Sequence, residues 1–148
     1  QWAALTGDPV TVSEFLDARA QQGRSWSYRL RAVGRTDGEG RVVGEPGPAL
    51  AVDYPDLYPP APPADLVCLP EEARVVIRWQ AARDAAGYRV ERRVASGDWE
   101  ALEELHPGPE YVDQSPPAGA LTYAVRAVDQ ASNRSEQAEC TALQGITR

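Results

Sequence analysis

The chain has 148 residues, enough for one or two small domains, and carries a net charge of −7 without any basic cluster. This charge argues against nucleic acid as a partner, because phosphates attract clustered arginines and lysines, and against electrostatic binding to an anionic membrane. No stretch approaches the roughly 20 apolar residues of a membrane span. The 13 prolines and 12 glycines are typical of many short strands joined by turns.

Residues 1–53 contain the same pattern as the last part of the chain. Residues 2–5 (Trp-Ala-Ala-Leu) return as residues 99–102 (Trp-Glu-Ala-Leu), and residues 15–17 (Phe-Leu-Asp) return as residues 111–113 (Tyr-Val-Asp). Residues 27–33 (Ser-Tyr-Arg-Leu-Arg-Ala-Val) return as residues 122–128 (Thr-Tyr-Ala-Val-Arg-Ala-Val). The interval of about 96 residues is that of a small domain, so the pattern predicts tandem domains rather than a solenoid of short repeats.

The first copy is shorter than the second and has no counterpart of residues 75–79 or 87–90. An isolated half of a sandwich would leave apolar side chains in water, and burial of such area, at about 25 cal/mol per Å2, is the main stabilising contribution. Three explanations follow. Preceding polypeptide completes the first domain, another chain completes its sheet, or the fragment is stabilised within a larger assembly. We favour the first explanation.

The segment 54–63 joins the two copies. It contains five prolines, which lack the amide donor that a central strand needs and favour an extended, semi-rigid polyproline II spacer. We therefore predict the C-terminal part of a first domain over residues 1–53, a linker over residues 54–63 and a second, complete domain over residues 64–148.

Residues 64–148 divide into short alternating segments separated by turn residues, which predicts about seven strands of an antiparallel sandwich. Val75, Ile77 and Trp79 recur at every second position, the period of a half-buried strand. Tyr88 and Val90 follow the same period. No segment shows sustained helical periodicity, apart from a weak stretch near residues 12–21.

Six short motifs follow one another in the second copy: Pro62-Pro63-Ala64-x-Leu66, Val75-x-Ile77-x-Trp79, Gly87-Tyr88-x-Val90-x-Arg92, Tyr111-x-Asp113, Leu121-Thr122-Tyr123-x-Val125-x-Ala127-Val128-Asp129 and Ser132-Asn133-x-Ser135. In this order they resemble the fibronectin type III family, and the first copy resembles the C-terminal half of such a domain. The resemblance implies an all-β fold of immunoglobulin-like antiparallel sandwiches in tandem, the first one incomplete. The proline-rich joints are similar to those of tandem modules in bacterial exported proteins and lipoproteins.

The resemblance implies structural roles for four aromatic residues. Trp79, in the second strand, and Tyr88 belong to the core. Tyr123, at the start of the sixth strand, makes a tyrosine-corner hydrogen bond, and Tyr28 is its counterpart in the first copy.

Cys68 and Cys140 fall in the first and last strands of the second copy. In the implied fold these two strands run side by side on opposite sheets, so a disulfide is geometrically plausible. It would close a loop of about 70 residues, for which the chain-entropy model gives roughly 4 kcal/mol of stabilisation. A bridge would indicate an oxidising compartment, and two buried free thiols are the alternative. Neither cysteine has a metal-ligand or CxxC partner nearby, so we expect no metal or redox role.

The candidate contact surface of the first copy is its long, glycine-rich loop over residues 34–47. Loops on a rigid scaffold often carry binding residues, and an idle flexible loop is the alternative. The charged residues of this loop that we select as contact candidates are Arg35, Asp37, Glu39 and Arg41.

The chain shows no arrangement of residues typical of catalysis. His106, the single histidine, lies in a Pro/Gly turn without a nucleophile signature, and no phosphate-binding glycine loop is present. The paired glutamates at 71–72 and 103–104 would need a cleft to act as glycosidase carboxylates, and a small filled sandwich offers none. We therefore expect no catalytic residues, no cofactor and no metal ion.

These observations favour a non-catalytic protein-binding or scaffolding module of an exported bacterial protein. We expect it on the periplasmic or cell-surface side, or lipid-anchored through a segment outside this sequence. The expected partner is another protein of unknown identity, or the subunits of a larger complex, and not nucleic acid. Two alternatives stay open: an accessory structural subunit of a larger membrane or envelope complex, and spacer domains of an extracellular glycoside hydrolase or similar enzyme.

Overall fold

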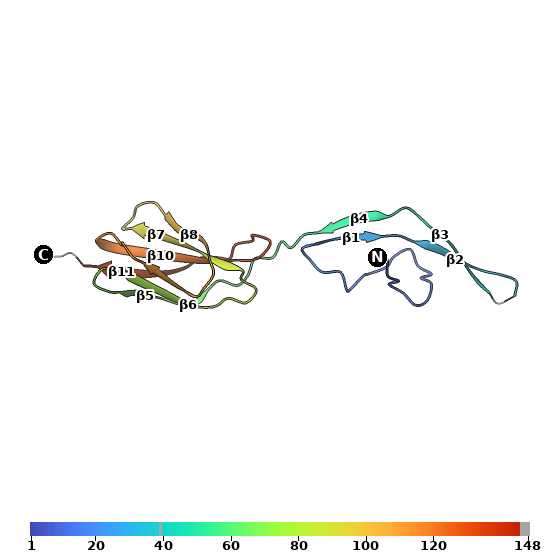
Figure 1. The fold of residues 1–148 in the computed structure, drawn as a ribbon, viewed down its shortest axis with the longest axis horizontal. Coiled ribbons are helices and arrows are strands. Elements are labelled where there is room, and N and C mark those ends of the chain that lie inside the picture. The colour runs from blue at the N-terminus through green and yellow to red at the C-terminus, as the bar shows by residue number, and fades with distance from the viewer. Residues whose placement is uncertain (39, 146–148) are drawn as a thin grey trace. The chain divides into compact units, whose positions relative to one another are not determined.

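The computed structural model describes residues 1–38 and 40–145, in which eleven β-strands and no helix are found (Figure 1). Every strand pair in this part of the chain is antiparallel. No described residue therefore belongs to a helix that could cross a lipid bilayer. The chain divides into two compact units, Gln1–Asp56 (unit 1) and Leu57–Arg148 (unit 2). The division falls inside the predicted linker 54–63.

Unit 2 is an immunoglobulin-like β-sandwich of two antiparallel sheets, as the sequence predicts. One sheet has the strand order β5-β6-β9, and the other has the order β11-β10-β7-β8. Figure 1 labels every strand of the two sheets except β9. The seven strands in the described part of unit 2 are β5 (Ala64–Pro70), β6 (Val75–Gln80), β7 (Gly87–Val94), β8 (Glu100–His106), β9 (Glu110–Asp113), β10 (Gly119–Val128) and β11 (Ala138–Gln144).

The core of unit 2 is built from side chains that recur at every second position of its strands, because successive side chains of a strand point to opposite faces. Trp79 of β6 packs edge to face against Tyr88 of β7, with 5.1 Å between the ring centroids. The other buried members of the core are Val75, Ile77, Val90, Leu121, Tyr123, Val125, Ala127 and Ala142.

The strand register shows which residues lie beside the core residues Ile77 and Tyr123. In the first sheet, Ile77 of β6 lies opposite Cys68 on one side and Tyr111 on the other. In the second sheet, Tyr123 of β10 lies opposite Arg92 on one side and Cys140 on the other.

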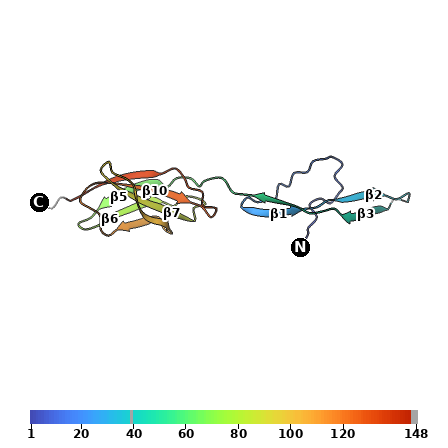
Figure 2. The same cartoon turned by 90° about the horizontal axis from the view of Figure 1, so that it is seen from above.

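Unit 1 contains two separate strand pairs. Strand β1 (Arg24–Tyr28) pairs with β4 (Leu50–Tyr54), and β2 (Arg31–Arg35) pairs with β3 (Arg41–Pro46). Figure 2 shows these pairs following one another within the unit. Residues 1–23 form no strand, and no described residue of unit 1 is buried. Unit 1 therefore has no hydrophobic core of its own in the part of the chain that the structure describes.

The proline-rich segment 54–63 is less free than the predicted spacer, because strands reach both of its ends and two of its prolines are buried. Strand β4 ends at Tyr54, the first residue of that segment, and β5 begins at Ala64, directly after it. Pro60 and Pro63 are buried, although a solvated polyproline spacer would expose them. Pro60 and Pro63 are therefore packed rather than free in solvent, whereas Pro62 between them is exposed.

Candidate functional site

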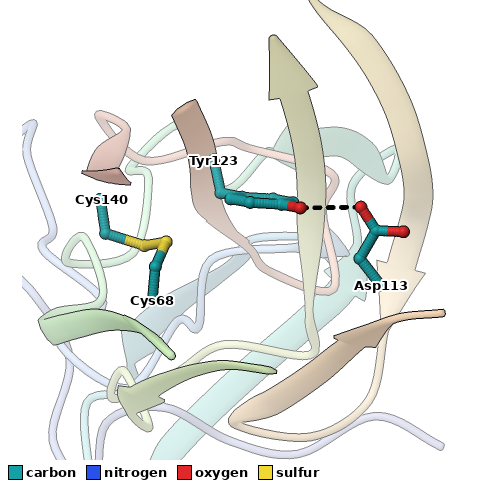
Figure 3. Close-up of a disulfide and its surroundings, with 4 residues drawn as sticks. All are labelled: Cys68, Asp113, Tyr123 and Cys140. Atoms are coloured by element: carbon teal, nitrogen blue, oxygen red, sulfur yellow. Dashed lines mark hydrogen bonds between the residues drawn. A yellow bond between two sulfur atoms is a disulfide. The ribbon is translucent and has the colours of Figure 1, made fainter. Parts of the chain in front are cut away.

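The carboxylate of Asp113, at the end of β9, is the centre of a hydrogen-bonded group in unit 2. Tyr123 donates its hydroxyl hydrogen to Oδ2 of Asp113 at 2.8 Å, as Figure 3 shows. Arg92 donates from Nη1 to the same oxygen at 2.7 Å, and the amide of Ser115 donates to Oδ1 at 3.2 Å. The side chains of Arg92 and Asp113 are only 11% and 7% exposed, so this ion pair is largely removed from water.

The surroundings shift the pKa values of Tyr123 and Arg92. Burial raises the pKa of Tyr123 far above its ordinary value, and the hydrogen bond and negative charge of Asp113 raise it further, while Arg92 lowers it. Burial lowers the pKa of Arg92, but its hydrogen bonds and ion pairs with Asp113 and Glu100 outweigh that effect and raise it overall. The tyrosine therefore stays a donor and the arginine a cation near neutral pH, which suits a structural role.

Unit 1 contains a matching pair. Tyr28 donates its hydroxyl hydrogen to Oδ2 of Asp17 at 3.1 Å, and the amide of Arg19 donates to Oδ1 of Asp17 at 3.0 Å. Partial desolvation raises the pKa of Tyr28, and the hydrogen bond and charge of Asp17 add to this. Both predicted corner tyrosines thus donate to aspartate carboxylates.

Cys68 of β5 and Cys140 of β11 form a disulfide, with their Cα atoms 5.7 Å apart (Figure 3). The two strands belong to different sheets, so the bridge joins the two layers of the sandwich covalently. No free cysteine is present among the described residues.

The two other predicted core residues, Trp79 and Tyr88, lie in the core of unit 2. The hydroxyl of Tyr88 accepts a hydrogen bond from the amide of Ala82 at 2.8 Å, whereas Nε1 of Trp79 is buried without a hydrogen-bond partner. His106 packs edge to face against the ring of Tyr111, and its Nε2 donates to the carbonyl of Glu110 at 2.6 Å.

The predicted contact loop is largely a β-hairpin rather than an irregular loop, because Val33 of β2 pairs with Val43 of β3. Arg35 and Arg41 lie opposite each other at the ends of the two strands. The predicted contact residue Asp37 lies in the exposed turn between them, and Glu39 lies outside the described residues. Arg41 also donates to Oδ1 of Asp8 at 3.1 Å.

The charged side chains on the outer face of unit 2 are paired with one another. Arg89 of β7 donates to Glu91 at 2.9 Å and to Glu104 of β8 at 2.5 Å. Arg126 of β10 lies 3.8 Å from the second oxygen of Glu91. These four side chains therefore neutralise one another. In residues 1–38 and 40–145, no three His, Cys, Asp or Glu side chains gather in a group that could hold a metal ion.

Sequence reasoning did not assign a role to Asp17, Asp113 or Arg92. The signal for the aspartates was present, since both copies carry an aromatic residue followed two positions later by aspartate. Arg92 stands in the Gly-Tyr-x-Val-x-Arg motif, but nothing in that motif indicates that its side chain reaches a carboxylate of the other sheet.

Comparison with known proteins identifies the class of fold. No family model matches the chain. The chain is similar to the crystal structure of FN3tt, with a TM-score of 0.52 and 16% identity over 60% of this chain and 97% of that one. It is similar to the twitchin kinase region from C. elegans, with a TM-score of 0.53 and 18% identity over 62% of this chain and 18% of that one.

A third similar structure is the glycoside hydrolase domain of Endo-D from Streptococcus pneumoniae R6, with a TM-score of 0.52 and 20% identity over 74% of this chain and 19% of that one. At such identities the likeness establishes the fold. The chain thus contains a fibronectin type III-like β-sandwich.

Proposed function

We propose that the chain is a non-catalytic protein-binding or scaffolding module of an exported bacterial protein. The observation that carries this proposal is the hairpin β2–β3, in which every residue of β2 is exposed. Its sheet has two strands in the described part of the chain, so each strand has one edge whose backbone groups can pair with a strand of another protein. Arg35, Asp37 and Arg41 at its end offer charged contacts that would select the partner.

The disulfide Cys68–Cys140 supports export. Disulfides form and persist in oxidising compartments and are rare where glutathione keeps thiols reduced. A module that joins its two sheets covalently is suited to the periplasmic or cell-surface side.

The hairpin can be tested with two charge-matched triple variants of the full-length protein. One replaces Arg35, Asp37 and Arg41 by alanine. The control replaces Arg83, Asp98 and Arg134 by alanine, which are exposed residues of unit 2 with the same charges. Proteins that co-purify with each variant from the envelope or culture medium of the encoding organism are quantified by mass spectrometry. We expect the hairpin variant to lose a partner that the wild type and the control retain. Equal recovery of every protein by both variants would contradict the role of the hairpin.

A second candidate is a spacer within a larger extracellular enzyme such as a glycoside hydrolase. It is supported by the similarity to Endo-D, of which this chain matches 19%. The intact mass of the native polypeptide tests it, because a spacer would be isolated as part of a chain well above 16.1 kDa that also hydrolyses a glycan. A native polypeptide of similar mass to this chain would exclude it.

A further inference from the structure

The turn between β2 and β3 contains Asp37-Gly38, the one place in the chain where glycine follows an aspartate. The other aspartates precede proline, alanine, tyrosine, leucine, tryptophan or glutamine. The backbone nitrogen after an aspartate can attack the carboxyl carbon of its side chain. Glycine favours this attack, because it has no side chain to crowd the nitrogen and its backbone rotates freely. The fold around the pair then decides whether the attack takes place.

The described structure leaves Asp37 and Gly38 unrestrained. Both residues are exposed and lie in a turn outside the two strands. A Cβ atom added to Gly38 would meet no heavy atom within 4 Å. In the part of the chain that the structure describes, neither residue makes a hydrogen bond or an ion pair. The hairpin is closed one residue before the pair, where the amide and the hydroxyl of Thr36 donate to the carbonyl of Gly40 at 2.9 Å and 3.2 Å.

Several other aspartates are held by their hydrogen bonds. Asp17 and Asp113 accept from the corner tyrosines. Asp53 of β4 accepts from a serine hydroxyl at 2.6 Å, and Asp129 accepts from the amide of Asn133 at 2.8 Å. The attack requires the nitrogen and the carboxyl carbon to approach to about 3 Å in a suitable orientation. A side chain held in place must first break its contacts to reach this geometry, whereas Asp37 needs only to rotate.

We propose that Asp37 is a site of spontaneous isomerisation to isoaspartate. The nitrogen of Gly38 forms a bond to Cγ of Asp37, and the carboxyl hydroxyl leaves with the amide proton as water, which gives a succinimide ring. Water then opens the ring. Attack at Cγ restores aspartate, and attack at the main-chain carbonyl carbon gives isoaspartate, in which the chain continues through Cβ and Cγ. The two products have the same atoms, and the reaction needs no reagent other than water.

The product changes the end of the hairpin. Isoaspartate adds one atom to the main chain between Thr36 and Gly40, and it moves the free carboxylate of Asp37 to the Cα atom. The two hydrogen bonds of Thr36 span this segment, so we expect them to weaken. The pairing of Val33 with Val43 lies farther from the turn and should persist.

The isomerisation can be measured in the folded, full-length protein, kept at neutral pH and physiological temperature for several weeks. Trypsin releases residues 36–41 and 84–89 as separate peptides, because an arginine precedes and ends each of them. The two forms of each peptide have equal mass and are separated by chromatography. The second peptide is the internal control, since Asp84 is also exposed in a turn but precedes Ala85. We expect isoaspartate to accumulate at least about tenfold faster in residues 36–41. Equal rates would overturn the proposal.

A synthetic peptide of residues 33–43 with blocked ends tests whether the fold leaves the pair free. We expect the rates of isomerisation in the peptide and in the folded protein to agree within about tenfold, because no described contact holds Asp37 or Gly38. A rate in the protein below that range would show that the folded hairpin restrains the pair, and the proposal would then be wrong.

Two glycine variants test the chemistry. Gly38→Ala places a methyl group beside the attacking nitrogen and should slow the isomerisation by about tenfold or more. The methyl group meets no heavy atom within 4 Å, so the hairpin should be retained. Gly34→Ala in β2 is the matched control, because its added methyl group also meets no heavy atom within 4 Å and Asp37-Gly38 stays intact. This variant should isomerise at the wild-type rate. The same rate in both variants would contradict attack by the nitrogen of Gly38.

Discussion

Asp113 accepts hydrogen bonds from three parts of unit 2: Arg92 of β7, Tyr123 of β10 and the amide of Ser115. Asp113 belongs to the sheet β5-β6-β9, whereas Arg92 and Tyr123 belong to the other sheet. A charged pair in these surroundings is held between the layers, and loss of either member leaves the other with its desolvation cost uncompensated.

We expect Arg92→Ala to reduce the free energy of unfolding by about 3 kcal/mol, because the Asp113 carboxylate would stay buried without its cation. The control is Arg78→Ala, which removes the pair with Glu110, where the arginine side chain is 57% exposed. That variant should cost less than about 1 kcal/mol. Urea unfolding followed by tryptophan fluorescence measures both values. Equal losses would show that the buried pair stabilises the fold no more than the exposed pair does.

The raised pKa of Tyr123 predicts a loss of stability in alkali. Above the ordinary tyrosine value of 10.0, the unfolded chain releases the phenolic proton while the folded chain retains it. The unfolded state then binds fewer protons, so the free energy of unfolding falls as pH rises. The stabilisation is present below that pH and is lost progressively above it. Unfolding curves at pH 8 and at pH values above 10 should show a smaller decrease in the free energy of unfolding for Tyr123→Phe than for the wild type. An equal decrease in the two proteins would contradict this origin of the alkaline instability.

At the scale of the elements, the first and last strands of unit 2 are the ones joined by the disulfide. Cys68 and Cys140 are separated by 72 positions in the sequence, so the bridge restricts nearly the whole domain in its unfolded state. It also holds β5 and β11, which belong to different sheets, at a fixed distance.

Reduction of the disulfide should lower the free energy of unfolding of unit 2 by roughly 4 kcal/mol, as should the double replacement Cys68→Ser and Cys140→Ser. Urea unfolding with and without a reductant measures the loss, and the double variant, which no longer responds to the reductant, is the control. In protein isolated without reductant, alkylation should leave the mass unchanged. Alkylation of both thiols in that protein would show that the bridge is absent.

The elements also show which parts of the fold the sequence could predict. Alternation suffices for β6 and β7, because their inward side chains are apolar and fill the core. Alternation could not predict that residues 2–5 and 15–17 stay outside any strand, since a strand needs a hydrogen-bonded partner and no described residue pairs with them. The glycines over residues 34–47 favour a loop, whereas the structure pairs Val33 of β2 with Val43 of β3 in a hairpin.

The candidate site, like the fold, could be predicted from the sequence only in part. The resemblance to a known fold is enough to expect that Cys68 and Cys140 meet, because it places their strands side by side. The acceptor of the Tyr123 hydroxyl could not be predicted, since Asp113 lies on another sheet and only the folded corner brings the two together.

On the scale of the whole molecule, the chain contains one unit with a buried core and one without, although both carry the same pattern. In unit 2, a disulfide and the Arg92–Asp113 ion pair each join the two sheets. The described residues of unit 1 have neither kind of link, so we expect the free energy of unfolding of unit 1 by itself to be low.

Limited trypsin digestion should reveal this difference, because every basic residue of the chain is arginine. We expect cleavage after Arg19 and Arg29 of unit 1 to precede cleavage after Arg92 and Arg126 of unit 2, since proteases cut segments that open easily. Mass spectrometry of the fragments over time gives the order. A digest in which both units are cut at the same rate would contradict the difference in stability.

The position of the sulfur bridge has a mechanical consequence. If the chain were pulled from both sides of unit 2, tension would pass from Cys68, near the start of the unit's sequence, directly to Cys140, near its end, through covalent bonds alone. The intervening polypeptide, which could extend by about 240 Å if it were fully stretched, would carry no load. In a single-molecule stretching experiment the oxidised module should therefore behave as a short inextensible link, and a reductant should convert it into a compliant one.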